Sequence, residues 1–88
     1  MIGLNVRVVL PEESVVVPVT PRVAVNFERQ FKIGLAKAFA TEQRLEHMYY
    51  LGWEAMKAAG HVVKPFEGFL DSITRVEFAE DDASPLAG

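Results

Sequence analysis

The chain has 88 residues, of which 50% are hydrophobic, and its 9 Lys and Arg against 12 Asp and Glu give a net charge of −3. A chain of this length forms one small domain that cannot bury so much apolar surface, so part of that surface is expected to meet a partner. The basic residues form no stripe that would follow phosphates, which argues against nucleic acid as a partner, and the absence of cysteine excludes disulfides and thiolate metal sites.

The first twenty residues predict a β-hairpin. Apolar residues alternate along the first strand at Leu4, Val6, Val8 and Leu10. A second run, 15–19, follows a turn at 11–14. Pro18 has no N–H to donate, so the second strand is expected at a sheet edge. A two-stranded ribbon is marginal alone and must lie on helices.

Thr20 and Pro21 predict the start of a helix, because a hydroxyl caps its N-terminus and proline suits the first helical position. This helix is expected to run to about Lys32 and to stop at Gly34. Its apolar face consists of Val23, Ala24, Phe27 and Phe31. The next segment, 35–40, predicts one or two helical turns in which Phe39 covers the core.

The longest predicted helix covers 42–59, with Thr41 as its N-cap and Gly60 as its stop. Its apolar stripe is expected to contain Leu45, Met48, Tyr49, Gly52, Ala55, Met56 and Ala59. The opposite, polar face is expected to contain Gln43, Glu46, His47, Glu54 and Lys57. Tyr50 falls among these polar residues and Trp53 at the border of the stripe.

A third amphipathic helix is expected to start near Pro65, with an apolar face of Phe66, Phe69, Leu70 and Ile73. The residues expected outside that face are Glu67, Asp71, Thr74 and Arg75. Val76 and Phe78 follow at the margin of the core. The sequence predicts the α+β class, with an N-terminal β-hairpin packed on about three α-helices and mostly helical content. We expect one domain at 1–78 and a flexible acidic tail at 79–88.

Catalytic and metal-binding signatures are missing from the sequence. His47 and His61 are the only histidines, and both are expected to be solvated. We therefore predict a protein that is not an enzyme and that uses no cofactor or metal. No apolar run approaches the ~18 residues that span a bilayer, and no basic region precedes an apolar one at the N-terminus, so neither a membrane partner nor a secretory leader is expected.

Four apolar residues are candidates for contact with a partner: Tyr50, Trp53, Val25 and Phe39. Tyr50 is the strongest of them, because the helical wheel places it outside the apolar stripe, where a large aromatic side chain suits an interface. Trp53 fits a core position as well as an interface.

Three segments together resemble the short tail assembly chaperones of long-tailed phages, especially those that infect actinobacteria. They are Val-Ala-Val-Asn-Phe-Glu-Arg-Gln-Phe at 23–31, Glu-Gln-Arg-Leu-Glu-His-Met-Tyr-Tyr-Leu-Gly-Trp-Glu-Ala at 42–55, and Phe-Glu-Gly-Phe-Leu-Asp at 66–71. The resemblance covers roughly residues 4 to 78 and consists of packing motifs in a fixed order.

This resemblance implies an assembly factor that associates with itself in the host cytoplasm and is not part of the mature virion. Such proteins coat the long tape measure protein, keep it soluble and help to recruit the major tail tube protein. The resemblance also implies a second, longer product of programmed ribosomal frameshifting that shares this domain. By this resemblance the present chain would correspond to the short form, and the family offers no catalytic residues.

Two other functional hypotheses remain open from the sequence alone. A small structural connector subunit of the virion has the same composition, and only its presence in purified particles would distinguish it. A ribbon-helix-helix-like DNA-binding dimer also begins with a strand, but here the strand offers only Arg7, the net charge is negative and two strands precede the first helix.

Overall fold

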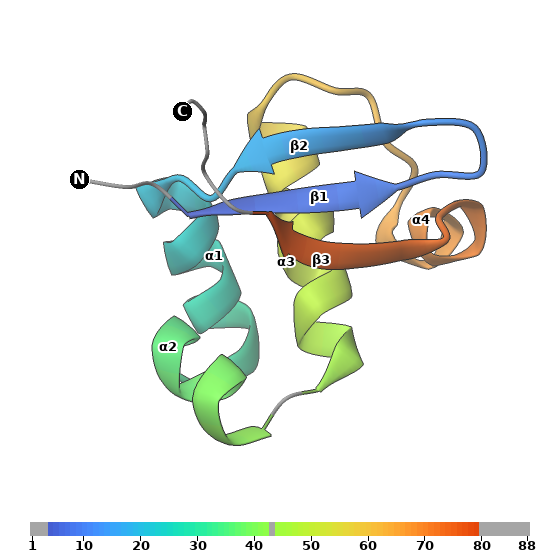
Figure 1. Cartoon of the computed structure of the whole chain (residues 1–88). Coiled ribbons are helices and arrows are strands. Elements are labelled where there is room, and N and C mark those ends of the chain that lie inside the picture. Colours follow the sequence, from blue (N-terminus) through green and yellow to red (C-terminus); the bar gives the residue numbers. More distant parts are fainter. Residues whose placement is uncertain (1–3, 43, 80–88) are drawn as a thin grey trace, which may run out of the picture.

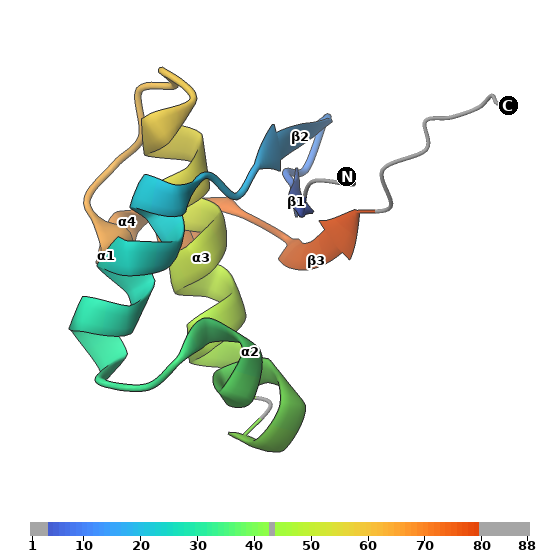
Figure 2. The same cartoon turned by 90° about the vertical axis from the view of Figure 1, so that its left-hand side faces the viewer.

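An antiparallel sheet lies against a layer of helices in the computed structural model, which describes residues 4–42 and 44–79. In chain order (Figure 1), the elements are β1 (Asn5–Val9), β2 (Ser14–Pro18), α1 (Pro21–Phe31), α2 (Leu35–Lys37), the π-helical turn η1 (Ala38–Glu42), α3 (Leu45–Ala58), α4 (Phe66–Ser72) and β3 (Arg75–Ala79). The turned view in Figure 2 places the helices on one side of the sheet. The predicted α+β class is confirmed.

The three strands follow the order β2-β1-β3, so the first strand lies in the centre and pairs antiparallel with both neighbours. The second strand lies at a sheet edge, as predicted. Val6 lies opposite Val17 on one side and Phe78 on the other. Successive residues point to opposite faces, so Arg7 and its partner Glu77 lie on the face away from the helices.

The third strand was not predicted, because Arg75 was interpreted as part of the preceding helix and Val76 and Phe78 as residues at the margin of the core. Helix α4 ends at Ser72, and Ile73 takes an extended conformation with φ −110° and ψ 161°. The chain then returns along β1, where Val76 becomes buried. The predicted tail begins one residue too early, because Ala79 is the last residue of β3; the rest of the tail lies outside the described residues.

Helix α1 begins as predicted, but a different residue caps its C-terminus. The Thr20 hydroxyl accepts a hydrogen bond from the Val23 N–H at 3.3 Å, with proline at the first helical position. Lys32, and not Gly34, ends the helix: it adopts the left-handed conformation with φ 59°, and its N–H donates to the Glu28 carbonyl at 2.8 Å. The Glu28 carboxylate also accepts from the Leu35 N–H at 2.8 Å, which fixes the turn into α2.

Helix α3 starts three residues later than predicted. Thr41 is not its N-cap, because the Thr41 hydroxyl donates to the Lys37 carbonyl at 2.7 Å within the π-helical turn. Arg44 precedes the first helical residue and supplies no side-chain cap. The predicted stop at the other end is confirmed, because Gly60 has φ 94°, a conformation that costs glycine little, and donates to the Lys57 carbonyl.

The predicted polar face of α3 is wrong at two positions. His47 is 1% exposed and Glu54 is 8% exposed, whereas Leu45, assigned to the apolar stripe, is 69% exposed. A wheel with one buried face does not describe this helix, because α1 packs on one side of it and the sheet on another. The ring of His47 contacts Phe27 of α1, while Gly52 faces Val76 of the sheet.

The core lies between the two layers. Its largest fully buried side chains are Phe27, Leu51, His47, Val6, Val8 and Val23. Burial of each large apolar side chain contributes about 2 kcal/mol, so a few such contacts decide the stability of so small a domain. Within residues 4–42 and 44–79, no helix is both long and apolar enough to cross a membrane.

Candidate functional site

The four predicted partner-binding residues lie in three different places. Tyr50 and Trp53 lie together in a groove between α1, α3 and α4. Phe39 lines a second groove, beside β3. Val25 is 39% exposed on α1, where it lines a shallow depression with two arginines. The structure therefore joins only Tyr50 and Trp53 into one site.

We call the first of these the aromatic groove. It has a volume of about 440 Å³ and is lined by Gln30, Phe31, Glu46, Tyr50, Trp53, Glu54, Phe66 and Glu67. Its aromatic members are half-buried and still pack against the core, so each offers one side to a partner. Phe31 and Phe66 were assigned to the core from their spacing. Their role as groove walls depends on how α1 and α4 meet α3, which the spacing alone does not contain.

The rings of this groove hold one another in place. The ring centroids of Tyr50 and Trp53 lie 5.5 Å apart, and Phe66 lies 5.6 Å from Tyr50 and 5.4 Å from Trp53. These are favourable distances for tilted aromatic pairs. The Trp53 indole N–H donates to the Lys64 carbonyl at 2.8 Å, which ties α3 to the segment before α4. The groove is thus built from side chains with little freedom left to lose on binding.

A buried carboxylate lies at the base of the groove. Glu54 accepts hydrogen bonds from the Asn26 side-chain amide at 3.1 Å and from the Tyr50 hydroxyl at 2.9 Å. The Lys57 ammonium lies 3.7 Å from the same carboxylate and 3.8 Å from the Trp53 ring centroid. Burial, then the hydrogen bond to Glu54 and its negative charge, raise the pKa of Tyr50 to about 12, so its hydroxyl stays a donor.

Two further carboxylates give the groove an acidic rim. Glu46 at the start of α3 and Glu67 at the start of α4 are both exposed and line it. Both were assigned to solvent-facing positions in the sequence, which is correct. That the two carboxylates lie beside the same aromatic side chains could not be predicted from the sequence, because they belong to two different helices. A site of this kind suits an apolar stripe flanked by basic side chains.

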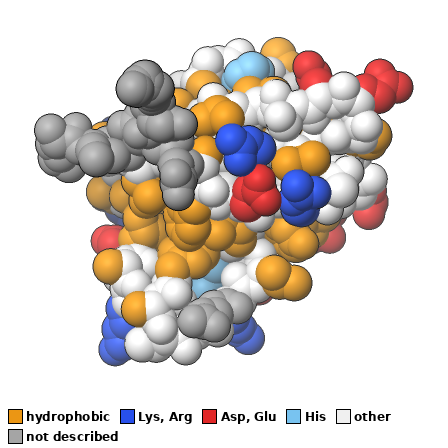
Figure 3. Space-filling model, in the orientation of Figure 1, with side chains coloured by type: hydrophobic (Ala, Val, Ile, Leu, Met, Phe, Trp, Pro, Cys, Tyr) orange, Lys and Arg blue, Asp and Glu red, His pale blue; other side chains and the backbone are white. Residues whose placement is uncertain are grey.

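We call the second site the strand groove. It has a volume of about 340 Å³ and is lined by Phe39, Arg44, Leu45, Met48, Val76, Glu77 and Phe78. In the space-filling view, hydrophobic side chains gather on this part of the molecule, below the sheet (Figure 3). Leu45 is 69% exposed and Phe78 38% exposed. The ring centroids of Phe39 and Phe78 lie 5.2 Å apart, which joins the π-helical turn to β3.

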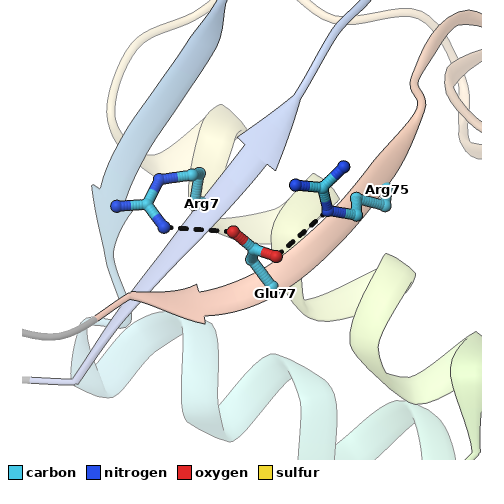
Figure 4. Close-up of polar contacts among 3 residues, drawn as sticks. All are labelled: Arg7, Arg75 and Glu77. Atoms are coloured by element: carbon cyan, nitrogen blue, oxygen red, sulfur yellow. Dashed lines mark hydrogen bonds and ion pairs between the residues drawn. The ribbon is translucent and has the colours of Figure 1, made fainter.

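An ion cluster of Arg7, Arg75 and Glu77 lies on the outer face of the sheet (Figure 4). The Glu77 carboxylate contacts Arg7 of β1 at 3.0 Å and Arg75 of its own strand at 3.1 Å. The hydrogen bonds from Arg75 and then Arg7 lower the pKa of Glu77 below its ordinary value. Two guanidinium groups share one carboxylate, so the cluster keeps a net positive charge and can accept another carboxylate.

Both grooves are suited to contact with another chain. Within the described residues, no group of three His, Cys, Asp or Glu side chains lies close enough together to hold a metal ion. Comparisons with protein-family models, with curated proteins and with solved structures gave no match.

Proposed function

We propose that this protein is a phage tail assembly chaperone that binds and solubilises the tape measure protein. The proposal combines the sequence resemblance with the character of the aromatic groove. Within the same proposal, the protein associates with itself, helps to recruit tail tube subunits, acts in the host cytoplasm and stays out of the mature virion. A frameshifted longer form shares its domain.

One observation carries the binding part of the proposal: fixed aromatic side chains, including Tyr50 and Trp53, share a groove with exposed carboxylates. An amphipathic helix buries its apolar stripe best in a complementary groove, where aromatic anchors supply most of the affinity. A tape measure protein is a long helical chain that needs such cover until the tail is built. Glu46 and Glu67 favour stretches in which Lys or Arg flank the stripe.

The test is co-expression with the tape measure protein of the same phage, followed by measurement of its soluble fraction. Removal of the rim charges by Glu46→Gln with Glu67→Gln should weaken binding about tenfold and reduce its salt dependence. The reason is that charges at the rim of an interface act mainly on the association rate. Both side chains are exposed, so the fold should survive. Trp53 is the single tryptophan of the chain, and its fluorescence reports directly on occupation of the groove.

The matched control is Glu12→Gln with Glu13→Gln, two exposed carboxylates in the hairpin turn. This variant has the same net charge as the rim variant and should bind normally. Equal loss in both variants would show that only overall charge matters and would remove the groove from the proposal. An insoluble tape measure protein in the presence of the unsubstituted chaperone would overturn the proposed function, and recovery of the chain from purified virions would favour a connector subunit.

A further inference from the structure

We infer that β3 forms the self-association surface: it pairs antiparallel with β3 of a second copy, which extends the sheet across a two-fold axis with Val76 opposite its own copy. This inference specifies the self-association within the proposed function and rests on it. Three features favour this pairing: the open edge of β3, the proline in the outer edge of β2, and the complementarity of β3 to itself.

The hydrogen-bond pattern shows which way the backbone groups of each strand point. The Val19 N–H donates to the Leu4 carbonyl and the Leu10 N–H to the Glu13 carbonyl, so the even-numbered residues of β1 bond to β2. In an antiparallel sheet, successive residues bond to opposite sides. The odd-numbered residues of β1 therefore bond to β3, in agreement with the bond from the Thr74 N–H to the Val9 carbonyl.

The outer edge of β3 follows from this pattern. Val76 and Phe78 lie opposite Val8 and Val6, so their own N–H and C=O groups point away from β1. Outside the helices and the sheet, the backbone hydrogen bonds among residues 4–42 and 44–79 involve neither residue. An open strand edge is a template for another strand. In Figure 1, β3 forms the lower edge of the sheet.

The opposite edge is less suited to such pairing. On β2, Val15 and Val17 bond inward to β1, so Ser14, Val16 and Pro18 point outward. Proline at an outward position removes one of the donors that an added strand needs. The two edges of the sheet therefore differ, and β3 is the one that contains no proline.

The charged residues of β3 favour a second copy of the same strand as the partner at this edge. With Val76 opposite its copy, Arg75 lies opposite Glu77 of the second copy, and Glu77 lies opposite the second Arg75. Each carboxylate then lies between Arg7 of its own chain and a guanidinium of the other, and this row of alternating charge favours the pairing. A shift that centres the pairing on Glu77 would place two carboxylates opposite each other.

The apolar surface agrees with the same arrangement. The strand groove runs along β3, and its exposed members include Leu45 and Phe78. Side chains on the inner face of an added strand point to the helix side of the sheet, and therefore into this groove. On that face a second copy brings its exposed Phe78, whereas its Val76 already packs against Gly52 of its own α3. The groove and the strand edge are thus covered together by one partner.

The first experiment is a mixing test on the full chain by light scattering after size exclusion, with no other protein present. Arg75→Glu alone and Glu77→Arg alone should each raise the dimer dissociation constant about tenfold or more, because each homodimer places like charges opposite each other twice. An equimolar mixture should restore the dimer, because both rows then contain opposite charges. Arg22→Glu, an exposed change of equal charge on α1, should have no effect.

The second experiment uses disulfide formation, since the natural chain has no cysteine. Arg75→Cys and Glu77→Cys proteins should cross-link with each other under mild oxidation and only weakly with themselves, because the proposed register makes these two positions direct neighbours. Val16→Cys, on the β2 edge, should stay uncross-linked. These substitutions lie on the outer face of the sheet, and far-ultraviolet circular dichroism checks that each variant folds.

The inference is overturned if the unsubstituted chain is monomeric, if both charge variants remain dimeric, or if the mixture fails to recover. Cross-linking through Val16→Cys in place of the β3 pair would overturn it as well. Each outcome is read without the tape measure protein, so failure here leaves the helix-binding proposal intact. Conversely, a recovered dimer that does not solubilise the tape measure protein would count against the proposed function alone.

Discussion

The Tyr50 hydroxyl donates a hydrogen bond to Glu54 Oε2 at 2.9 Å, one turn further along α3. This contact turns Tyr50 toward the helix layer, where its ring lies 5.2 Å from that of Phe31. The sequence placed Tyr50 and Glu54 together on a solvated face. The structure shows instead that the Tyr50 ring is half-buried and the Glu54 carboxylate is buried, and that the hydrogen bond joins these two groups.

The first prediction concerns this hydrogen bond. Tyr50→Phe should lower the free energy of unfolding by about 1.5 kcal/mol, because a hydrogen bond to a charged acceptor is worth more than a neutral one and Glu54 stays buried. Urea unfolding measures the loss. In a Glu54→Leu background, Tyr50→Phe should leave the free energy of unfolding almost unchanged, because the acceptor of the hydrogen bond is already gone. Equal effects of Tyr50→Phe in both backgrounds would mean that the bond contributes nothing.

The same contact changes how Tyr50 must be tested as a partner-binding residue. From the sequence, Tyr50→Glu is a surface substitution with little effect on stability. In the structure it would bring a second carboxylate beside Glu54 and remove a ring from the aromatic cluster, so it should destabilise the fold by about 2 kcal/mol or more. Loss of solubilisation in that variant would not identify a binding surface. The exposed rim residues Glu46 and Glu67 avoid this difficulty.

A second prediction concerns alkaline pH. The folded pKa of Tyr50 is raised from 10.0 to about 12, so the folded state favours the neutral phenol. This contribution to stability is fully present below pH 10.0 and is lost as the pH rises toward about 12. Ultraviolet absorbance of tyrosinate should show a group titrating near that upper value, and Tyr50→Phe should remove it. An unchanged titration curve in the variant would contradict the prediction.

The parts of the fold that sequence could predict are those with a single local cause. Alternation along β1 and the apolar run of β2 are visible within twenty residues, and Thr20-Pro21 marks the start of α1 by its own chemistry. Strand β3 has five residues and pairs with a strand about seventy residues away, as the contact between Arg7 and Glu77 shows. Nothing near it in the sequence indicates that pairing.

The candidate site divides in the same way. Tyr50 and Trp53 were selected because they fall outside one apolar stripe, and they do lie together in a groove. The selection took α3 to have one buried side, whereas α1 and the sheet cover two. The walls of the grooves come from elements whose approach to α3 depends on the whole fold. Phe78 could be recognised as a groove residue only once β3 was known.

A third prediction follows from the burial of His47. Its ring is 1% exposed and lies 4.5 Å from Phe31 and 5.3 Å from Phe27, and its Nδ1 has no hydrogen-bond partner in the part of the chain that the structure describes. His47→Leu should therefore change the free energy of unfolding by less than about 1 kcal/mol, because an apolar side chain fills the same space. His47→Ala should cost about 3 kcal/mol through the cavity it leaves. Similar losses in both variants would show that the imidazole makes a polar contact that the fold needs.

The last prediction concerns a close approach of α3 to the sheet at Gly52. A Cβ atom added to Gly52 would lie 2.8 Å from Cγ1 of Val76 and 3.3 Å from Cγ2 of Val8. Alanine is the better helix former by about 1 kcal/mol, but the clash with two buried side chains should cost about 2 to 3 kcal/mol. Gly52→Ala should therefore lower the thermal midpoint by about 5 °C or more.

Two further variants separate the clash from a general effect of replacing glycine. At Gly34 the nearest atom to an added Cβ is the carboxylate of Glu28 at 3.9 Å, so Gly34→Ala should leave the midpoint unchanged or raise it slightly. Val76→Ala removes the methyl groups that Gly52→Ala would meet, so the double variant should lose less stability than the two single losses added together. Strict additivity would show that helix and sheet move apart to accept the methyl group, and the close approach would then not limit the packing of α3.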